Sequence, residues 1–185
     1  MSTDESATAI LARLDGAATE MSWLLERGYR RAHVLRFVGE HHQLRQQDRN
    51  VLERVVFSEE DAQRRQTRLV NGDALRGATV VVDGYNVLIS MEVASRGEPL
   101  FLCDDGVLRD VAARRGLLGS VDEVSAEIER ACRLLREKEV SDVSFVFDRQ
   151  VSRSGDLAKV CGAILADHGI SGEGRTESRA DRSII

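Results

Sequence analysis

The sequence has a single proline, three cysteines and few aromatic residues (one Trp, two Tyr and five Phe) in 185 positions, and no long apolar run. No window approaches the roughly 18 apolar residues that a membrane span needs, so we expect no membrane partner. The first ten residues, MSTDESATAI, are acidic and polar, the wrong charge for a secretory or transit peptide. The composition, 42% hydrophobic and 31% charged, is that of a soluble globular protein. The sequence therefore predicts a cytoplasmic protein.

The three cysteines are Cys103, Cys132 and Cys161. Their odd number and wide spacing exclude a disulfide framework and a zinc site of the Cys-x-x-Cys kind. Cys132 and Cys161 fall on the apolar faces of predicted helices, where a free thiol acts as a small hydrophobic group. We expect all three to be structural.

Charge is distributed unevenly along the chain. Residues 1–76 carry 12 basic and 12 acidic side chains, whereas residues 77–185 carry 14 basic and 19 acidic side chains, a net charge of −5. Residues 27–68 hold ten Arg against six acids. A solvated Arg-rich helical face explains this excess more simply than nucleic-acid binding does.

Residues 1–76 predict helices only. Apolar residues recur at spacings of three and four in the first segment, with Gly28 as its C-terminal stop. A second helix is expected to stop near Gly39, and Ser58 can cap a fourth with Asp61 as the capping-box acid. The four expected helices cover about residues 10–25, 34–38 and 51–56 and the residues after Ser58.

The pattern changes at Gly77. Short β-branched and aromatic runs predict strands at 78–82, 99–103 and 143–147, and helices are expected at about 121–138 and 155–168. This alternation is typical of a parallel sheet flanked by helices. The expected fold class is therefore α/β, with a helical module at 1–76 and an α/β domain at 77–185.

Each of the three predicted strands is followed by aspartate: Asp83, the pair Asp104 and Asp105, and Asp148. The carboxyl ends of parallel strands form one crevice, where these groups would converge with Asn86. Clustered carboxylates repel one another unless a cation is bound, and Mg²⁺ prefers such oxygen ligands. A single Asp is better explained as a turn residue. Asp83, Asn86 and Asp148 together favour a metal site that activates water beside a phosphate.

The loop after Asp148 contains Ser152, Arg153 and Ser154 and leads into a predicted helix. Hydroxyls, a guanidinium and free backbone N–H groups at a helix N-terminus can bind a phosphate. Ordinary N-capping by Ser152 or Ser154 is an equally good explanation.

The histidines suggest no site. His41 and His42 are adjacent and are expected not to share one face of a regular element, and His33 and His168 are isolated. Surface or capping roles are expected for all four.

Several longer motifs carry a resemblance. They are GY at 28–29, LRFVG at 35–39, RNVL at 49–52, VFS at 56–58, VDGYNVL at 82–88, LCDDG at 102–106, FD at 147–148 and SRSG at 152–155. Together they resemble the mainly archaeal family described as domain of unknown function 434, over about residues 10–170.

The second half is further similar to PIN-like nucleases of the NYN type, whose first strand ends in Asp-Gly-Tyr-Asn. That resemblance implies a PIN-like, Rossmann-like sheet, a Mg²⁺ or Mn²⁺ cofactor and hydrolysis of RNA. Carried over by position, it implies metal ligation by Asp83 and Asp148, orientation of a ligand or water by Asn86, and further ligands at Asp104, Asp105 and Asp181. Such domains normally continue beyond this length, so residues 77–185 are expected to be either a compact or a C-terminally truncated form.

Two functions follow as hypotheses. In the first, the protein is a metal-dependent ribonuclease-like enzyme whose N-terminal helices hold RNA or a partner, with Ser152, Arg153 and Ser154 on a phosphate. In the second, it is a non-catalytic RNA- or protein-binding module that keeps the fold, so that replacing Asp83 leaves binding intact. The net charge of −5 in residues 77–185 counts against RNA binding by that half.

Overall fold

The computed structural model describes residues 6–111 and 121–178. The chain forms two compact units, Met1–Leu69 with Gly97–Ala113, and Val70–Arg96 with Arg114–Ile185. We call them the helical unit and the sheet unit. The expected division at 76/77 differs in two respects, because the first boundary lies at 69/70 and residues 97–113 group with the N-terminal helices. Neither described stretch contains a helix with the length and hydrophobicity of a membrane span.

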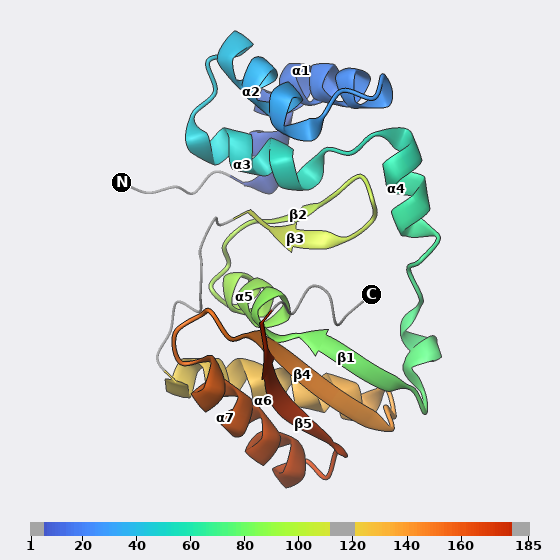
Figure 1. Cartoon of the computed structure of the whole chain (residues 1–185), viewed down its shortest axis with the longest axis vertical. Helices are drawn as coiled ribbons and strands as arrows, with labels where there is room; N and C mark the ends of the chain where they lie inside the picture. Colours follow the sequence, from blue (N-terminus) through green and yellow to red (C-terminus); the bar gives the residue numbers. More distant parts are fainter. Residues whose placement is uncertain (1–5, 112–120, 179–185) are drawn as a thin grey trace. The chain divides into compact units, whose positions relative to one another are not determined.

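The helical unit contains four α-helices, drawn in blue to green in Figure 1. They are α1 (Ala7–Glu26), α2 (Arg31–His41), α3 (Gln46–Val55) and α4 (Glu59–Gln66), close to the four expected. Ser58 caps α4 as predicted, since its Oγ accepts a hydrogen bond from the Asp61 N–H at 3.2 Å.

Gly28 ends α1 as predicted. Its φ of 79° is in the left-handed region that glycine adopts without strain. The N–H of Gly28 donates to the Leu25 carbonyl and that of Tyr29 to the Leu24 carbonyl. These two hydrogen bonds form a Schellman motif, which satisfies the last carbonyls of the helix.

Gly39 does not end the second helix. It lies buried within α2, and a Cβ at this position would lie 2.6 Å from the Arg49 guanidinium. Arg49 in turn donates from Nε to the Leu44 carbonyl at 3.1 Å. The glycine is therefore explained by the close approach of α3.

The predicted strand at 99–103 is not part of the parallel sheet, which corrects that expectation. It forms β2 (Leu100–Leu102), which pairs antiparallel with β3 (Leu108–Asp110) as a separate hairpin in the helical unit. The Asp104 N–H donates to the Val55 carbonyl, and Phe101 and Cys103 belong to the buried core of the helices. The apolar residues of this strand therefore pack against helices.

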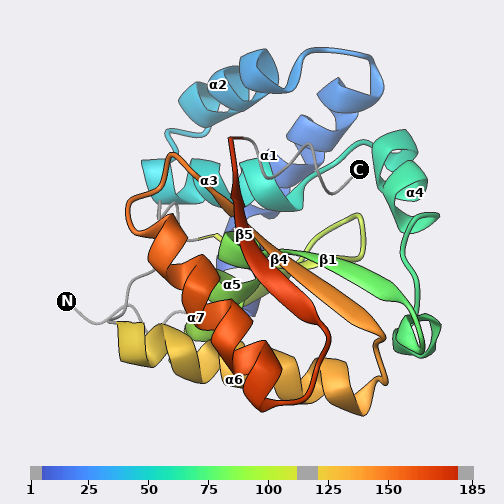
Figure 2. The same cartoon turned by 60° about the horizontal axis from the view of Figure 1, so that its bottom comes forward.

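Three parallel strands make up the sheet of the second unit, which is thus a mixed α/β structure. They are β1 (Thr79–Asp83), β4 (Asp142–Asp148) and β5 (Gly172–Glu177), in the order β1-β4-β5. Figure 2 shows β4 between its two neighbours. The first two were predicted, whereas β5 was not.

Three α-helices accompany this sheet: α5 (Gly84–Ser95), α6 (Val121–Glu137) and α7 (Ser154–Asp167). The Tyr85 ring of α5 packs edge-on against Phe147, and a Cβ on Gly174 would lie 2.1 Å from the Ala158 carbonyl oxygen of α7. Gly174 pairs with Phe145, which lies on the same face of β4 as Phe147. Helices α5 and α7 therefore cover the same face of the sheet. Helix α6 packs against both of these helices. Before these, Gly72–Leu75 form a short 3-10 turn.

Candidate active site at the carboxyl edge of the sheet

Three acidic residues end the three parallel strands: Asp83 on β1, Asp148 on β4 and Glu177 on β5. Asp83 pairs with Val146, and Asp148 pairs with Glu177. Because side chains alternate along a strand, this register places all three on the face opposite Phe147. We call them the acidic edge.

Asp83 is also the N-cap of α5. Its Oδ1 accepts the Asn86 backbone N–H at 3.1 Å, and its Oδ2 accepts the Asn86 side-chain amide at 2.7 Å. The structure therefore brings Asp83 and Asn86 together, as predicted from the sequence. Asn86 is exposed, and Asp83 is half-buried.

Asp148 is half-buried, and its Oδ1 accepts the Gln150 N–H at 3.0 Å. Within the described part of the chain its other oxygen accepts no hydrogen bond. Asp148 and Asp83 lie on neighbouring strands, two residues out of register. With about 3.3 Å per residue and 4.8 Å between strands, their Cα atoms lie roughly 8 Å apart.

Tyr85 is a candidate that the sequence analysis missed. It is 8% exposed, and its hydroxyl has no hydrogen-bond partner among the described residues. Burial, and secondly the negative charge of Asp148, raise the pKa of Tyr85 to about 12. A buried hydroxyl without a hydrogen-bond partner is costly, so this group is one that a ligand or water could satisfy.

Glu177 was missed as well, because its strand was not predicted. It is half-buried and forms an ion pair with Arg175, which also pairs with Glu173 at 3.5 Å. In the sequence, Glu177 could have been found only as a further acid after the helix at 154–167, in addition to Asp83 and Asp148. Arg175 offsets part of the negative charge of the edge.

The loop after Asp148 has the predicted position but not the predicted capping. Arg153 occupies the N-cap of α7 with a φ of 66°, and its side chain makes no capping hydrogen bond. Ser152 and Arg153 are exposed, whereas Ser154 is buried as the first residue of α7. Neither serine is therefore the N-cap.

Asp104 and Asp105 lie in the helical unit, in the turn between β2 and β3. Asp104 Oδ2 accepts the Phe57 N–H at 2.9 Å. Asp105 is fully buried and binds both terminal nitrogens of Arg109, at 2.6 and 2.8 Å. The expectation that they end a strand of the parallel sheet is wrong, since this segment turns back on itself.

The surroundings of Asp105 favour its ionised form. Burial acts to raise its pKa, but the hydrogen bonds from Arg109 and the Val107 N–H, with the charges of Arg109 and Arg65, lower it overall. This carboxylate holds the hairpin turn against the helices. The remaining predicted ligand, Asp181, lies outside the described residues.

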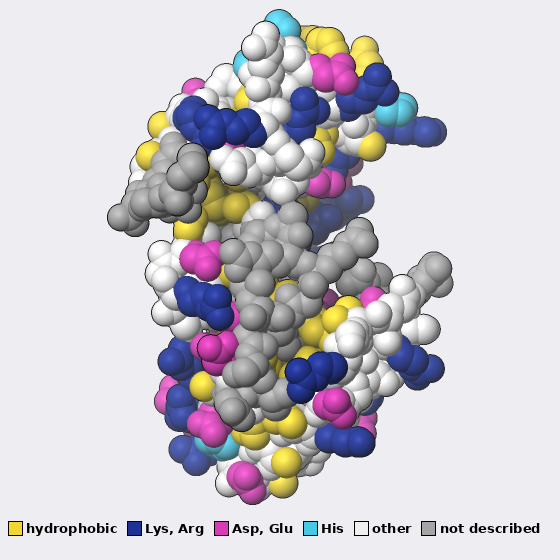
Figure 3. Space-filling view, turned by 90° about the vertical axis from the view of Figure 1, so that its left-hand side faces the viewer, with side chains coloured by type: hydrophobic (Ala, Val, Ile, Leu, Met, Phe, Trp, Pro, Cys, Tyr) yellow, Lys and Arg dark blue, Asp and Glu magenta, His cyan; other side chains and the backbone are white. Residues whose placement is uncertain are grey.

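On the face drawn in Figure 3, Lys and Arg are interspersed with Asp and Glu among the coloured side chains.

The three cysteines are buried, as predicted, and burial raises the pKa of Cys132 to about 11 and that of Cys161 to about 12. Such thiols are inert, which fits a structural role.

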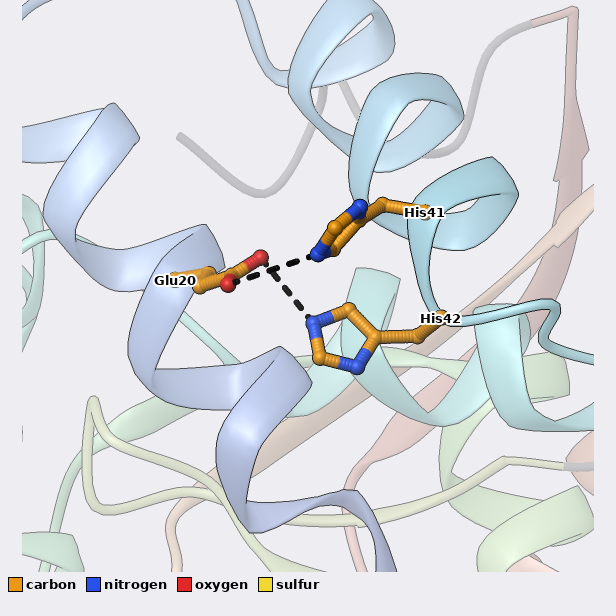
Figure 4. Close-up of side chains that lie close together, drawn as sticks. All are labelled: Glu20, His41 and His42. Carbon is orange, nitrogen blue, oxygen red and sulfur yellow. Dashed lines mark hydrogen bonds and ion pairs between the residues drawn. The ribbon is translucent and has the colours of Figure 1, made fainter.

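The two adjacent histidines do converge, contrary to the expectation. His41 ends α2, and His42 is the residue just beyond the helix, so the helical periodicity that separates neighbours does not apply to the pair. Both reach Glu20 of α1, as Figure 4 shows. Across residues 6–111 and 121–178, this is the one group of three His, Cys, Asp or Glu residues whose ligand atoms lie within 4.8 Å of one another.

Comparison with known proteins shows which family the chain belongs to. The family model described as "Protein of unknown function (DUF434)" matches residues 13–68, and "Domain of unknown function (DUF5616)" matches residues 72–185. The chain is 30% identical over 160 residues to an uncharacterised protein of Methanocaldococcus jannaschii, covering 86% of this chain and 76% of that protein. No solved structure matches the chain.

The resemblance over residues 10–170 is thus confirmed for residues 13–68, and the second half carries a family signature of its own. The chain belongs to the DUF5616 family, with a DUF434 region at its N-terminus.

Proposed function

We propose that the protein is a metal-dependent ribonuclease-like enzyme whose sheet unit is a PIN-like domain and whose reaction is phosphodiester hydrolysis. The observation that carries this proposal is the position of Asp83 and Asp148 at the carboxyl ends of adjacent parallel strands, on one face of the sheet. Ligands of open parallel sheets bind at that edge.

The donor set fits Mg²⁺ or Mn²⁺. Such ions take hard oxygen ligands and are usually held by one or two carboxylates together with water and phosphate oxygens. Asp83 and Asp148 would supply the carboxylates, and bound metal would activate water and offset the charge of the scissile phosphate.

Each nearby side chain has a definite task in this proposal. Asn86 orients the Asp83 carboxylate through its two hydrogen bonds. Exposed Ser152 and Arg153, with the first N–H groups of α7 at Ser154, bind a flanking phosphate.

The test is cleavage of a mixed RNA pool with Mn²⁺ or Mg²⁺ by the wild type and by Asp83→Asn and Asp148→Asn. Loss of a metal-holding carboxylate is expected to reduce the cleavage rate by about 100-fold or more. Asp142→Asn is the matched control, because Asp142 lies on the same face at the opposite end of β4. EDTA must abolish cleavage.

Cleavage that survives EDTA or Asp83→Asn would contradict the proposal, and so would an equal loss in Asp142→Asn. A capping role alone for Asp83 would instead appear as a lower unfolding free energy, which circular dichroism under urea measures for each variant.

A non-catalytic RNA- or protein-binding module is the second candidate. It is favoured by the two hydrogen bonds that Asp83 accepts from Asn86, one of which caps α5. RNA retention in a filter assay without cleavage, unchanged in Asp83→Asn, would support it.

A further inference from the structure

Glu20, His41 and His42 come together through three features of the helical unit. Glu20 lies on α1 four residues after Gly16, and so on the same side of the helix. A Cβ on Gly16 would lie 3.8 Å from His42 Cε1, so the His42 ring lies over this glycine. His41 stacks on Phe37, one turn earlier on α2, with an interplanar angle of 3°.

The two imidazoles present the same atom to the carboxylate. His42 Nε2 lies 3.0 Å from Glu20 Oε2, and His41 Nε2 lies 4.0 Å from Glu20 Oε1. The rings meet edge to face with centroids 5.0 Å apart, so both nitrogens point into one space between α1 and α2, as Figure 4 shows.

We propose that Glu20, His41 and His42 form a binding site for Zn²⁺. Zinc takes imidazole nitrogen and carboxylate oxygen at about 2.0–2.2 Å, so its tetrahedral ligands lie roughly 3.3 Å from one another. The His42–Glu20 pair already has about that separation. The three ligand atoms lie within 4.8 Å of one another, so the His41 ring has to rotate toward the His42–Glu20 pair, which its exposed side chain allows.

The nitrogen and oxygen donors of this group favour Zn²⁺ over the Mg²⁺ or Mn²⁺ proposed for the acidic edge. Imidazole suits Zn²⁺ and its first-row neighbours, whereas Mg²⁺ and Ca²⁺ require oxygen ligands. Three protein ligands leave a fourth position for water or a ligand. The side chains of Glu20 and His41 are 43% and 61% exposed, so an ion can enter from solvent.

Binding would join the middle of α1 to the C-terminal end of α2. Zinc binds imidazole through a nitrogen lone pair, so it would hold both histidines in the neutral form.

The experiment is calorimetric titration of the full chain with ZnCl₂, after dialysis against EDTA and then buffer, with Co²⁺ absorption as an independent readout of coordination. We expect one high-affinity site per chain and loss of affinity by about tenfold or more in His42→Gln and in Glu20→Gln. His33→Gln is the matched control, because His33 lies exposed on α2 away from the group.

Absence of saturable binding would overturn the proposal and leave an ion pair between Glu20 and the histidines. Binding that is unchanged in His42→Gln and Glu20→Gln would also overturn it, because the ion would then be held elsewhere. Zinc affinity is measured without RNA, so failure of this site and failure of the proposed nuclease function are separate results. Circular dichroism shows for each variant that the helices are retained.

Discussion

At the scale of the residue, Tyr85 is exceptional. Its ring is buried against Phe147 at a centroid distance of 5.3 Å, and its hydroxyl finds no partner among the described residues. Because the raised pKa means that the folded protein holds this proton more tightly than the unfolded chain, Tyr85 stabilises the fold fully below pH 10. That contribution is lost as the pH rises through about 12.

The variant Tyr29→Phe isolates this titration, since the chain has two tyrosines. Its tyrosinate absorbance is expected to appear with a midpoint near 12. Adding Asp148→Asn should lower the midpoint only in part, because burial is the larger cause and the charge of Asp148 the smaller. A midpoint at 10, the ordinary value, would show that Tyr85 is solvated.

At the scale of the element, two glycines on facing segments have opposite roles. A Cβ on Gly174 would lie 2.1 Å from the Ala158 carbonyl oxygen, so Gly174→Ala must separate β5 from α7. We expect it to lower the free energy of unfolding by about 1–3 kcal/mol, measured by urea denaturation.

Gly162→Ala on α7 is the control, because a Cβ there meets only the Gly174 nitrogen, at 3.8 Å. Removing a glycine from a helix interior should raise the free energy of unfolding by up to about 1 kcal/mol. Equal effects of the two substitutions would mean that α7 and β5 are not in close contact.

The helices and strands that could be predicted from the sequence are those whose own residues show a hydrophobic pattern. Helix α6 was predicted because its buried residues repeat at helical spacing, and β4 because it is an apolar run. Strand β5, GEGRTE, was missed because Gly172 and Gly174 meet the backbones of Val143 and Ala158, so the neighbours set this strand.

The same reason limited the candidate site. Asp83 and Asn86 share a turn, so local spacing brought them together, and Asp148 followed a recognisable strand. Glu177 depended on the unrecognised strand, and Tyr85 on its packing against Phe147. The strand at 99–103 carried a valid apolar pattern, but no local signal could indicate which core would bury it.

At the scale of the whole molecule, Phe101 links distant parts of the sequence. It is fully buried in the core formed by α1, α2 and α3, although it lies beyond β1 and α5 in the sequence. Phe101→Ala should cost about 3–5 kcal/mol in the helical unit. Hydrogen exchange is then expected to accelerate in α1–α3 more than in β4.

Phe145→Ala provides the reverse case, because Phe145 is fully buried in β4 of the sheet unit. It should accelerate exchange in β4 and β5 first. Acceleration of the sheet by Phe101→Ala as great as that of the helices would contradict the grouping of residues 97–113 with the helical unit.

The chain passes three times from one unit to the other, at 69/70, 96/97 and 113/114. This path sets the order in which the two units can be completed during synthesis. The helical unit lacks its hairpin until residue 110 has left the ribosome, and by then β1 and α5 have emerged. Among the strands that the structure describes, β1 pairs with β4 alone, and β4 begins at Asp142. At about 5–20 residues per second, an edge with unpaired N–H and C=O groups therefore stays exposed for several seconds on the nascent chain. Slower translation across this interval would prolong the stage at which the chain is most open to misassembly or to a chaperone.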